Sequence, residues 1–343
     1  MKKSLRIATL AVAICMILGA WAVVYAKTET EKNSAAMEMT TAVSGRTDTT
    51  TGLSTGTAIF QKADLFSDRD LQQTADLTKA VTYAVSDDED ISITAAGVYV
   101  LTGSAKNVTV TVEANKDDKV QLVLDGLAVT NGDAPAIYVR SADKVFVTTS
   151  ADSSLSVTGA FAADGDAKVD GVIFSKSDLT LNGSATLTIS STKNGIVGKD
   201  DVKITGGTYA ISAKVKAIEA NDSIRIADGT LDLTAGTDGL HAENDEDDSK
   251  GYIYIGGGSV TVNAGDDGIH AATVVQVDDG TVAVTAAEGI EGTYVQLNGG
   301  TVIVNGQQVT SLPDQFGGNG GRGGWGGNGG RGGWGGNGGR GGH

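Results

Sequence analysis

Cysteine is almost absent from this 343-residue chain, and the one cysteine, Cys15, lies in an apolar run near the N-terminus. The run "IATLAVAICMILGAWAVV" follows the basic segment "MKKSLR" and precedes "VYA" at 24–26. This order predicts that residues 1–26 are a secretory signal peptide, although 18 apolar residues also suffice for an uncleaved membrane anchor. The mature, secreted or cell-surface chain would contain no cysteine, which excludes disulfides and a thiol nucleophile.

Basic residues are scarce: 26 Lys and Arg stand against 42 Asp and Glu, for a net charge of −16. Cleavage would remove Lys2, Lys3 and Arg6 and no acid, which takes the charge to −19. Such a charge disfavours nucleic acid and anionic lipid as partners and suits divalent cations or a cation-bridged acidic polymer. Aromatic residues make up only 5%, which argues against a flat aromatic platform for crystalline cellulose.

Hydrophobic periodicity is missing at both ends. Residues 27–58 are rich in Thr, Ser, Ala and Glu, and we predict a disordered linker there. Residues 317–343 are three nine-residue units in which 18 of 27 residues are Gly, so we predict a flexible tail. Alternatively, Trp325, Trp334 and the arginines of the tail contact glycan or the cell wall.

A helical period is missing from the segment between these ends, residues 59–316. Apolar and polar residues alternate there in short runs broken by Gly turns, which predicts strands. The chain also repeats itself, with units that start at Gly171, Gly195, Ala217, Gly239, Gly268 and Gly289. The spacing predicts an all-β fold, a right-handed single-stranded parallel β-helix with rungs of ~22 residues. Residues 97–170 would form earlier, less regular rungs.

Parallel stacking places equivalent residues of successive rungs above one another at ~4.8 Å. We therefore expect two apolar stacks inside the helix. The first contains Val202, Ile224, Ile253 and Val275, and the second contains Tyr209, Leu231, Val260, Val282 and Val302.

One corner of the rungs gathers acids. The residue before each rung's Gly runs Asp170, Asn194, Lys216, Asp238, Asp267, Glu288, and the residue two after it runs Ile173, Val197, Glu219, His241, His270, Glu291. Carboxylates one rung apart repel by about 0.9 kcal/mol in water, and Ca²⁺ takes oxygen ligands at ~2.3–2.6 Å. We therefore predict calcium ligands at this edge, namely Asp238, Asp266, Asp267, Glu288, Glu219 and Glu291; a solvated acidic edge is the alternative.

Histidine occurs three times, and His241 and His270 share the context Asp-Gly-aliphatic-His-Ala. They are candidates for sugar contacts or ordinary surface residues. A zinc site built from Asp238, His241, Asp267 and His270 has suitable N and O donors but no third His or Cys. The inserted acids of "ENDEDDSKG" (243–251) lack EF-hand spacing, so this loop is either solvated or folds over the neighbouring acids.

A third column lies outward on the next strand. It contains Lys203, Arg225, Tyr254, Gln276 and Gln296. Long polar side chains with an aromatic ring at rung spacing suit a polysaccharide groove, in which Arg225 pairs with a uronate. An ordinary solvated sheet face is the alternative.

The chain resembles the extracellular carbohydrate-binding β-helix proteins of clostridia and related bacteria, whose fold is similar to that of pectate lyases. The resemblance covers about residues 60–310 and rests on "FSDRDLQQTADL" (66–77), the runs at 97–139, 142–149 and 170–183, and the "DGIHA" rungs. It implies binding of plant cell-wall polysaccharide, cellulose or acidic pectin, with bound calcium. One rung, "KVKAI" (214–218), lacks the acid before Gly, which puts a cation there in doubt.

These observations predict non-catalytic, calcium-assisted binding of polysaccharide by a monomer. The first alternative is a pectate-lyase-like enzyme, in which Arg140 or Arg225 removes the proton that calcium acidifies. The second is a structural or adhesive rod with flexible ends.

Overall fold

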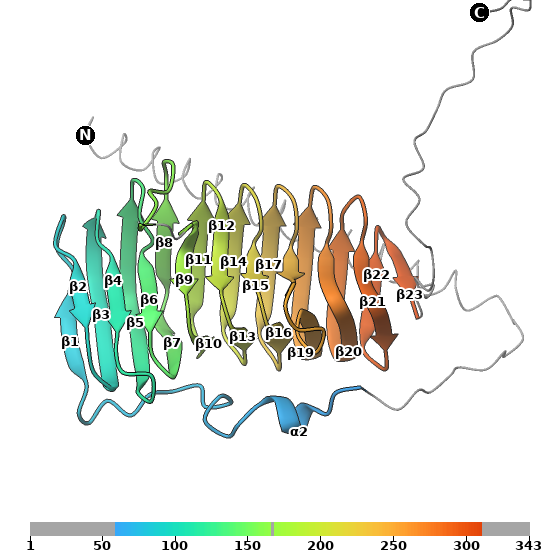
Figure 1. The fold of residues 1–343 in the computed structure, drawn as a ribbon, viewed down its shortest axis with the longest axis horizontal. Coiled ribbons are helices and arrows are strands. Elements are labelled where there is room, and N and C mark those ends of the chain that lie inside the picture. Colours follow the sequence, from blue (N-terminus) through green and yellow to red (C-terminus); the bar gives the residue numbers. More distant parts are fainter. Residues whose placement is uncertain (1–58, 166–167, 311–343) are drawn as a thin grey trace, which may run out of the picture. The chain divides into compact units, whose positions relative to one another are not determined.

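A computed structural model describes residues 59–165 and 168–310. The predicted signal peptide (1–26), linker (27–58) and Gly-rich tail (317–343) lie outside these residues. The described residues form a β-solenoid of about nine turns (Figure 1), as predicted, with one short helix, α2 (Lys62–Leu65). In this part of the chain no helix has the length and apolar character needed to span a membrane.

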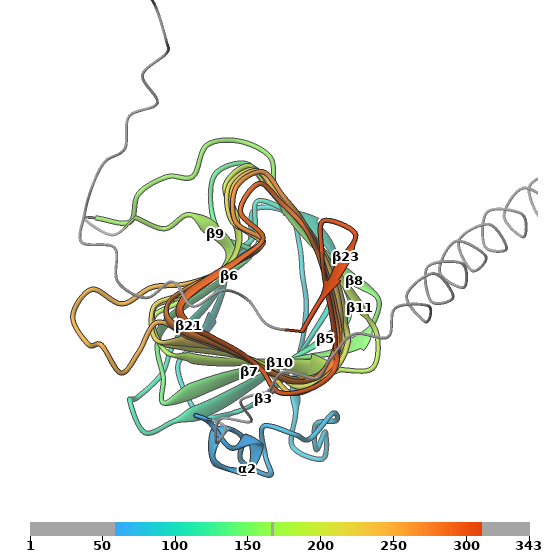
Figure 2. The ribbon, with the colours of Figure 1, turned by 90° about the vertical axis from the view of Figure 1, so that its right-hand side faces the viewer.

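The strands stack into three parallel ladders around one apolar core (Figure 2). The first ladder is formed by β1 (Val81–Ala84), β3 (Gly97–Lys106), β5 (Lys119–Asn131), β7 (Lys144–Ala151), β10 (Asp178–Gly183), β13 (Asp201–Ile204), β16 (Ser223–Ile226), β19 (Tyr252–Ala264), β20 (Ile269–Thr285) and β21 (Ile290–Leu297).

Long strands pass from one ladder to the next. The second ladder joins parts of β3, β5, β19 and β20 with β8 (Ser153–Val157), β11 (Thr186–Ser191), β14 (Thr208–Ala213), β17 (Thr230–Ala235) and β22 (Thr301–Val304). β23 (Gln307–Val309) pairs antiparallel with β22.

The third ladder carries the acidic corner. It joins the starts of β20 and β21 with β2 (Ile91–Ile93), β4 (Val110–Glu113), β6 (Ile137–Ser141), β9 (Gly171–Ser175), β12 (Asn194–Gly198), β15 (Ile218–Ala220) and β18 (Leu240–Ala242). Turns thus begin at Val81, earlier than the irregular rungs predicted from 97.

The two predicted apolar stacks are confirmed. Val202, Ile224, Ile253 and Val275 pair in that order on the first ladder. On the second ladder, the predicted members from Tyr209 to Val302 stack in register, and every member of both stacks is buried. Because equivalent apolar side chains of successive turns pack on one another, each turn covers the apolar face of the next.

Glycine in the Asp-Gly-aliphatic-His stretches is required by close packing. A Cβ at Gly239 would lie 2.2 Å from Cγ1 of Val262, and a Cβ at Gly268 would lie 2.0 Å from Cγ1 of Val284. Only glycine leaves room for these core valines. The repeated stretch is therefore one corner of the solenoid, and His241 pairs in register with His270.

One predicted column is offset by a residue. Ile196 pairs with Ile173, so Val197 lies level with Phe174 and not with Ile173. Because side chains alternate between the two faces of a strand, a slip of one residue turns Ile173 into the core and Phe174 outward. The expectation for Ile173 is therefore wrong.

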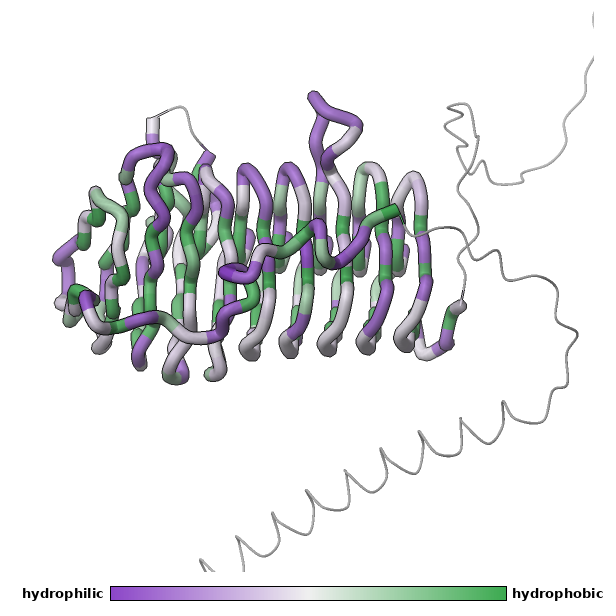
Figure 3. Tube along the Cα trace, turned by 90° about the horizontal axis from the view of Figure 1, so that it is seen from below, coloured by the Kyte–Doolittle hydropathy of each residue, from purple (hydrophilic) through white to green (hydrophobic). Residues whose placement is uncertain are grey.

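An N-terminal segment, residues 59–77, crosses the outside of the first ladder; we call it the strap. It contains α2 and runs against the order of the turns, from the turns near β20 back toward β7 (Figures 1 and 3). It is the part of the described chain whose position the repeat pattern does not indicate.

Candidate functional site

The third predicted column lies beneath the strap. Lys203, Arg225, Tyr254, Gln276 and Gln296 do stack in register on the first ladder. However, Lys203 is only 7% exposed, and Tyr254 and Gln276 have no exposed surface. The expectation that this column faces an open groove is wrong for these three residues, because the strap occupies the surface.

The strap is fixed by backbone as well as by side-chain contacts. The backbone N–H of Phe60 donates to Oε1 of Gln276 at 2.9 Å, and Nε2 of Gln276 donates back to the carbonyl of Phe60 at 2.9 Å. Phe66 packs against Tyr254 with ring centroids 6.2 Å apart. These contacts satisfy polar groups that would otherwise be buried without partners.

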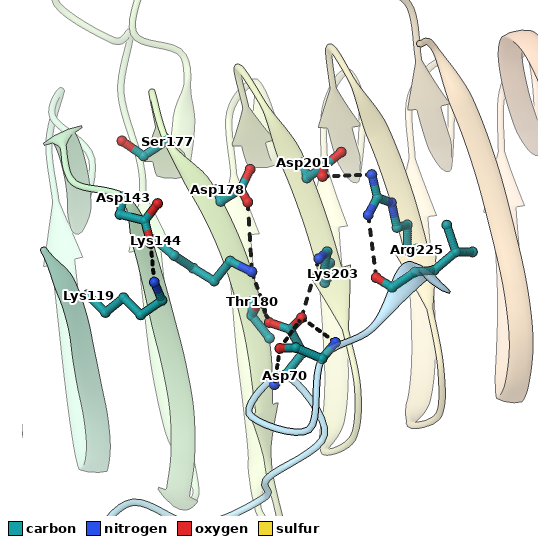
Figure 4. Close-up of polar contacts among 12 residues, drawn as sticks. Asp70, Lys119, Asp143, Lys144, Ser177, Asp178, Thr180, Asp201, Lys203 and Arg225 are labelled. Carbon is teal, nitrogen blue, oxygen red and sulfur yellow. Dashed lines mark hydrogen bonds and ion pairs between the residues drawn. The ribbon is translucent and has the colours of Figure 1, made fainter. Parts of the chain in front are cut away.

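A charged cluster holds the strap farther along. Asp70 is 1% exposed; its Oδ1 lies 3.1 Å from Nζ of Lys144, and its Oδ2 lies 3.3 Å from Nζ of Lys203 (Figure 4). Burial alone would raise the pKa of Asp70, but hydrogen bonds from Ser67 and the charges of Lys203 and Lys144 lower it far below its usual value. Lys203 is therefore part of a structural ion cluster.

A different outward column, on the third ladder, remains accessible in its later turns. Successive strands place its members directly above one another. We call it the outer column; it consists of Tyr138, Phe174, Val197, Glu219, His241, His270 and Glu291.

The early part of the outer column is apolar and covered. Tyr138 and Phe174 meet edge to face, with centroids 5.7 Å apart, and both rings are buried. The guanidinium of Arg140 lies 4.9 Å from the centre of the Tyr138 ring, and Nζ of Lys199 lies 5.7 Å from that of Phe174. These rings serve cation–π packing and do not form a platform for sugar.

Glu219 is the first polar residue of the outer column, and two lysines form ion pairs with it. Its carboxylate lies 3.5 Å from Nζ of Lys199 and 3.7 Å from Nζ of Lys216, and it accepts a 3.2 Å hydrogen bond from Asn194. Its charge is thus already paired, which makes it a poor calcium ligand. The predicted role of Glu219 at a cation site remains a prediction that the geometry does not favour.

Two stacked imidazoles follow. The rings of His241 and His270 lie 4.8 Å apart at an interplanar angle of 12°. Nδ1 of His241 lies 2.9 Å from Oδ2 of Asp238, although the two atoms are not aligned for a hydrogen bond. Nδ1 of His270 lies 3.4 Å from Oδ2 of Asp267 and 3.4 Å from Oε2 of Glu291. Nδ1 of each histidine therefore lies close to the acid before its own glycine.

The predicted calcium ligands separate into groups. Donor atoms of Asp238, Asp266 and Asp267 lie within 4.8 Å of one another, as do those of Asp267, His270 and Glu291. We call these five residues together with His241 the histidine corner, which thus consists of Asp238, His241, Asp266, Asp267, His270 and Glu291. Glu288 is exposed and belongs to neither group among the described residues.

Burial and crowding shift the carboxyls in opposite directions. Burial, together with the charges of Glu291, Asp238 and Asp266, raises the pKa of Asp267 to about 6 against a lowering by His270. Burial also acts to raise the pKa of Asp238, but contact with His241 and the charge of Lys216 bring it below its usual value. A cation at this corner would relieve the repulsion that Asp267 experiences.

The inserted loop 243–251 forms a wall beside this corner (Figure 2, the orange loop). Glu243 lies 3.1 Å from Nε2 of His241, and Asn244 and Lys250 bind Asp222 at 3.0 and 2.7 Å. Between loop and ladder lies a pocket of about 330 Å³. Its lining residues are Lys216, Glu219, Ala220, Asn221, His241, Glu243, Asn244, Asp245 and Glu246.

The sequence correctly predicted that the acids and histidines of the corner lie together, but it did not predict three features. The strap was overlooked, although its Asp70 stands in the stretch "FSDRDLQQTADL" that carried the resemblance. The aromatic rings under Arg140 and Lys199 and the pocket beside the loop were also missed. The adjacent apolar residues Leu65 and Phe66, in "DLFSDRDL" before the first strand, were the available signal for the strap.

Comparisons with known proteins agree with this architecture. The profile of a family described as carbohydrate-binding domain-containing protein matches residues 87–311. A carbohydrate-binding domain-containing protein of Acetivibrio thermocellus is 33% identical over 170 residues, which is 48% of this chain and 59% of that relative's length. A polysaccharide lyase-like protein from C. thermocellum, solved as a gadolinium derivative, superposes with a TM-score of 0.59 at 29% identity and covers 65% of this chain and 96% of its own.

Proposed function

We propose that this chain, which belongs to the family of carbohydrate-binding domain-containing proteins, is a secreted, non-catalytic binder of acidic polysaccharide that calcium assists. The pocket beside the histidine corner carries the proposal. Its volume of about 330 Å³ falls in the range of small-ligand sites. Lys216, Asn221 and Asn244 offer donors and Glu219 an acceptor, which suits sugar hydroxyls and a uronate.

Calcium would be held by Asp238, Asp266 and Asp267. These carboxylates supply the oxygen donors that Ca²⁺ prefers, and their donor atoms already lie within 4.8 Å of one another. Bound calcium would offset the repulsion among the three acids and attract the carboxylate of a uronate unit. The pocket and the acids share one side of the third ladder, so one polymer chain would contact both.

The arginines favour binding over catalysis. A lyase needs a base that is free to remove a proton. Arg225 lies 2.7 Å from Asp201 under the strap, and Arg140 lies 3.2 Å from Asp164. Both candidate bases are thus engaged by acids of the chain itself.

Sedimentation with insoluble polygalacturonate and with cellulose, in calcium or in EDTA, tests the proposal. We expect retention on polygalacturonate that EDTA weakens. The double variant Asp238→Asn/Asp266→Asn should bind as weakly in calcium as the parent chain in EDTA, whereas Glu288→Gln should bind normally. Retention on neither polymer would refute the binding role, and absorbance near 235 nm from an unsaturated product would show lyase activity.

A further inference from the structure

We infer that Asp267, His270 and Glu291 form a second, chemically distinct cation site, which selects a zinc-type transition metal over calcium. The three side chains come from two successive turns: Asp267 and His270 flank the start of β20, and Glu291 follows on β21. The carboxylate of Asp267 is common to this site and to the proposed calcium ligands. The inference does not rest on polysaccharide binding, because His270 and Glu291 are not among those calcium ligands.

The spacing of the donors matches a tetrahedral metal. Nδ1 of His270 lies 3.4 Å from one oxygen of Asp267 and 3.4 Å from one oxygen of Glu291. Zinc binds such donors at ~2.0–2.2 Å in a tetrahedral arrangement, for which two ligand atoms stand about 3.4 Å apart. A good N–H···O hydrogen bond would be nearer 2.9 Å. The observed distances therefore fit shared ligation of an ion better than direct hydrogen bonding.

Buried polar atoms without hydrogen-bond partners gather at this corner. Among the described residues, six buried side-chain atoms lack a partner, and four of them lie here: Oγ1 of Thr237, Nδ1 of His241, Oδ1 of Asp267 and Nδ1 of His270. Native proteins rarely leave such atoms unsatisfied, and an ion is one of the standard explanations. A cation held by Oδ2 of Asp267 and Nδ1 of His270 would satisfy one of the four directly, the nitrogen of His270.

His241 provides an independent indication. It is nine-tenths buried and its Nε2 lies 3.1 Å from an oxygen of Glu243, whereas its Nδ1 has no hydrogen-bond partner. That nitrogen lies 2.9 Å from Oδ2 of Asp238 without the alignment of a hydrogen bond. A buried ring nitrogen without a hydrogen-bond partner therefore lies inside the histidine corner, beside the proposed site.

Donor chemistry separates this site from the calcium ligands. Imidazole nitrogen suits zinc, copper and nickel, whereas carboxylate oxygen alone suits calcium. Asp238, Asp266 and Asp267 offer only oxygen, but Asp267, His270 and Glu291 offer one nitrogen with two carboxylates. Three protein ligands leave a fourth tetrahedral position open to water or to an oxygen of a bound molecule, as in other three-ligand zinc sites.

Titration of the chelator-treated, purified chain with Co²⁺ and Zn²⁺ tests the inference. Co²⁺ should give the intense visible absorption of a tetrahedral site, Zn²⁺ should displace it, and calcium should not. His270→Ala and Glu291→Gln should each weaken Co²⁺ and Zn²⁺ binding at least tenfold and leave calcium binding unchanged. Glu288→Gln, an exposed acid on the same turn as Glu291, should alter neither.

Two results would overturn the inference. The first is equal Zn²⁺ affinity for the parent chain and His270→Ala. The second is Zn²⁺ binding that calcium displaces and that Asp266→Asn abolishes while His270→Ala spares it, because the ion would then sit on the oxygen ligands alone. Circular dichroism of each variant shows that the fold is retained.

Discussion

The carboxylate of Asp70 lies 3.3 Å from the ammonium nitrogen of Lys203, a residue 133 positions later in the chain. The same carboxylate meets Lys144 from another turn. One acid of the strap thus pairs with the buried Lys203 and with the partly buried Lys144, which lie on separate rungs. The strap therefore acts as a clamp along the first ladder, and the surface beneath it belongs to the interior of the protein.

Removing this acid should destabilise the fold strongly. Asp70→Asn would leave Lys203 buried without its direct counter-charge, whereas Lys144 would keep Asp178 at 3.8 Å. Breaking a buried pair in this way costs roughly 3–5 kcal/mol. Urea unfolding measures the free energy of unfolding. Asp68→Asn is the matched control, since Asp68 is exposed and should change it by less than about 0.5 kcal/mol. Equal stabilities of the two variants would contradict the clamp.

Acid should weaken the strap for the same reason. The pKa of Asp70 in the folded chain lies below its ordinary value of 3.8, so the unfolded chain takes up the proton first as pH falls. The stabilisation is complete above the ordinary pKa and is lost as pH drops toward the folded value. Below about pH 4 the parent chain should lose stability more steeply than Asp70→Asn, as thermal unfolding at a series of pH values will reveal. Parallel curves would remove Asp70 from the acid response.

The glycine of the second Asp-Gly-aliphatic-His stretch should not tolerate a methyl group. In Gly268→Ala the new Cβ would lie 2.0 Å from Cγ1 of Val284, and overpacking of this kind costs about 1–3 kcal/mol. Gly132→Ala is the control, because its nearest neighbour would be 3.8 Å away. Comparison of the two denaturation midpoints decides whether close packing or turn conformation explains the repeated glycine.

Tyr254 should matter for stability and not for glycan binding. Its hydroxyl donates to Asp278 at 2.9 Å, and its ring is fully buried. Tyr254→Phe should therefore cost roughly 0.5–1.5 kcal/mol and leave sedimentation with polygalacturonate unchanged. If Tyr254→Phe lost glycan binding but kept its stability, the column on the first ladder that contains Tyr254 would belong to the glycan-binding surface.

Lys216 should contribute to binding because it lines the pocket and is half-buried there. Lys216→Ala should reduce affinity for polygalacturonate several-fold. In this variant Glu219 keeps Lys199 as a partner, so the charge of Glu219 stays paired. Lys214→Ala changes the net charge equally at an exposed position two residues away. Binding isotherms in which both variants lose the same affinity would indicate a general charge effect and not a site.

The acidic and histidine-bearing corner was predictable because a parallel solenoid repeats itself. Once the unit length of ~22 residues is recognised, Asp238 and Asp267 must stack, and so must His241 and His270. The inward apolar stacks follow from the same rule, since alternation along each strand decides which side chains face the core. These features depend only on neighbours one turn apart.

The sequence by itself therefore determined the solenoid, its core and the alignment of the corner. Only the tertiary structure decided which outward-facing side chains are accessible to a ligand. The strap hides Lys203, Tyr254 and Gln276, the lysines at 199 and 216 neutralise Glu219, and a one-residue offset exchanges Ile173 for Phe174. Contacts between residues more than a hundred positions apart do not follow the repeat, because they depend on how particular side chains fit together after the turns have stacked.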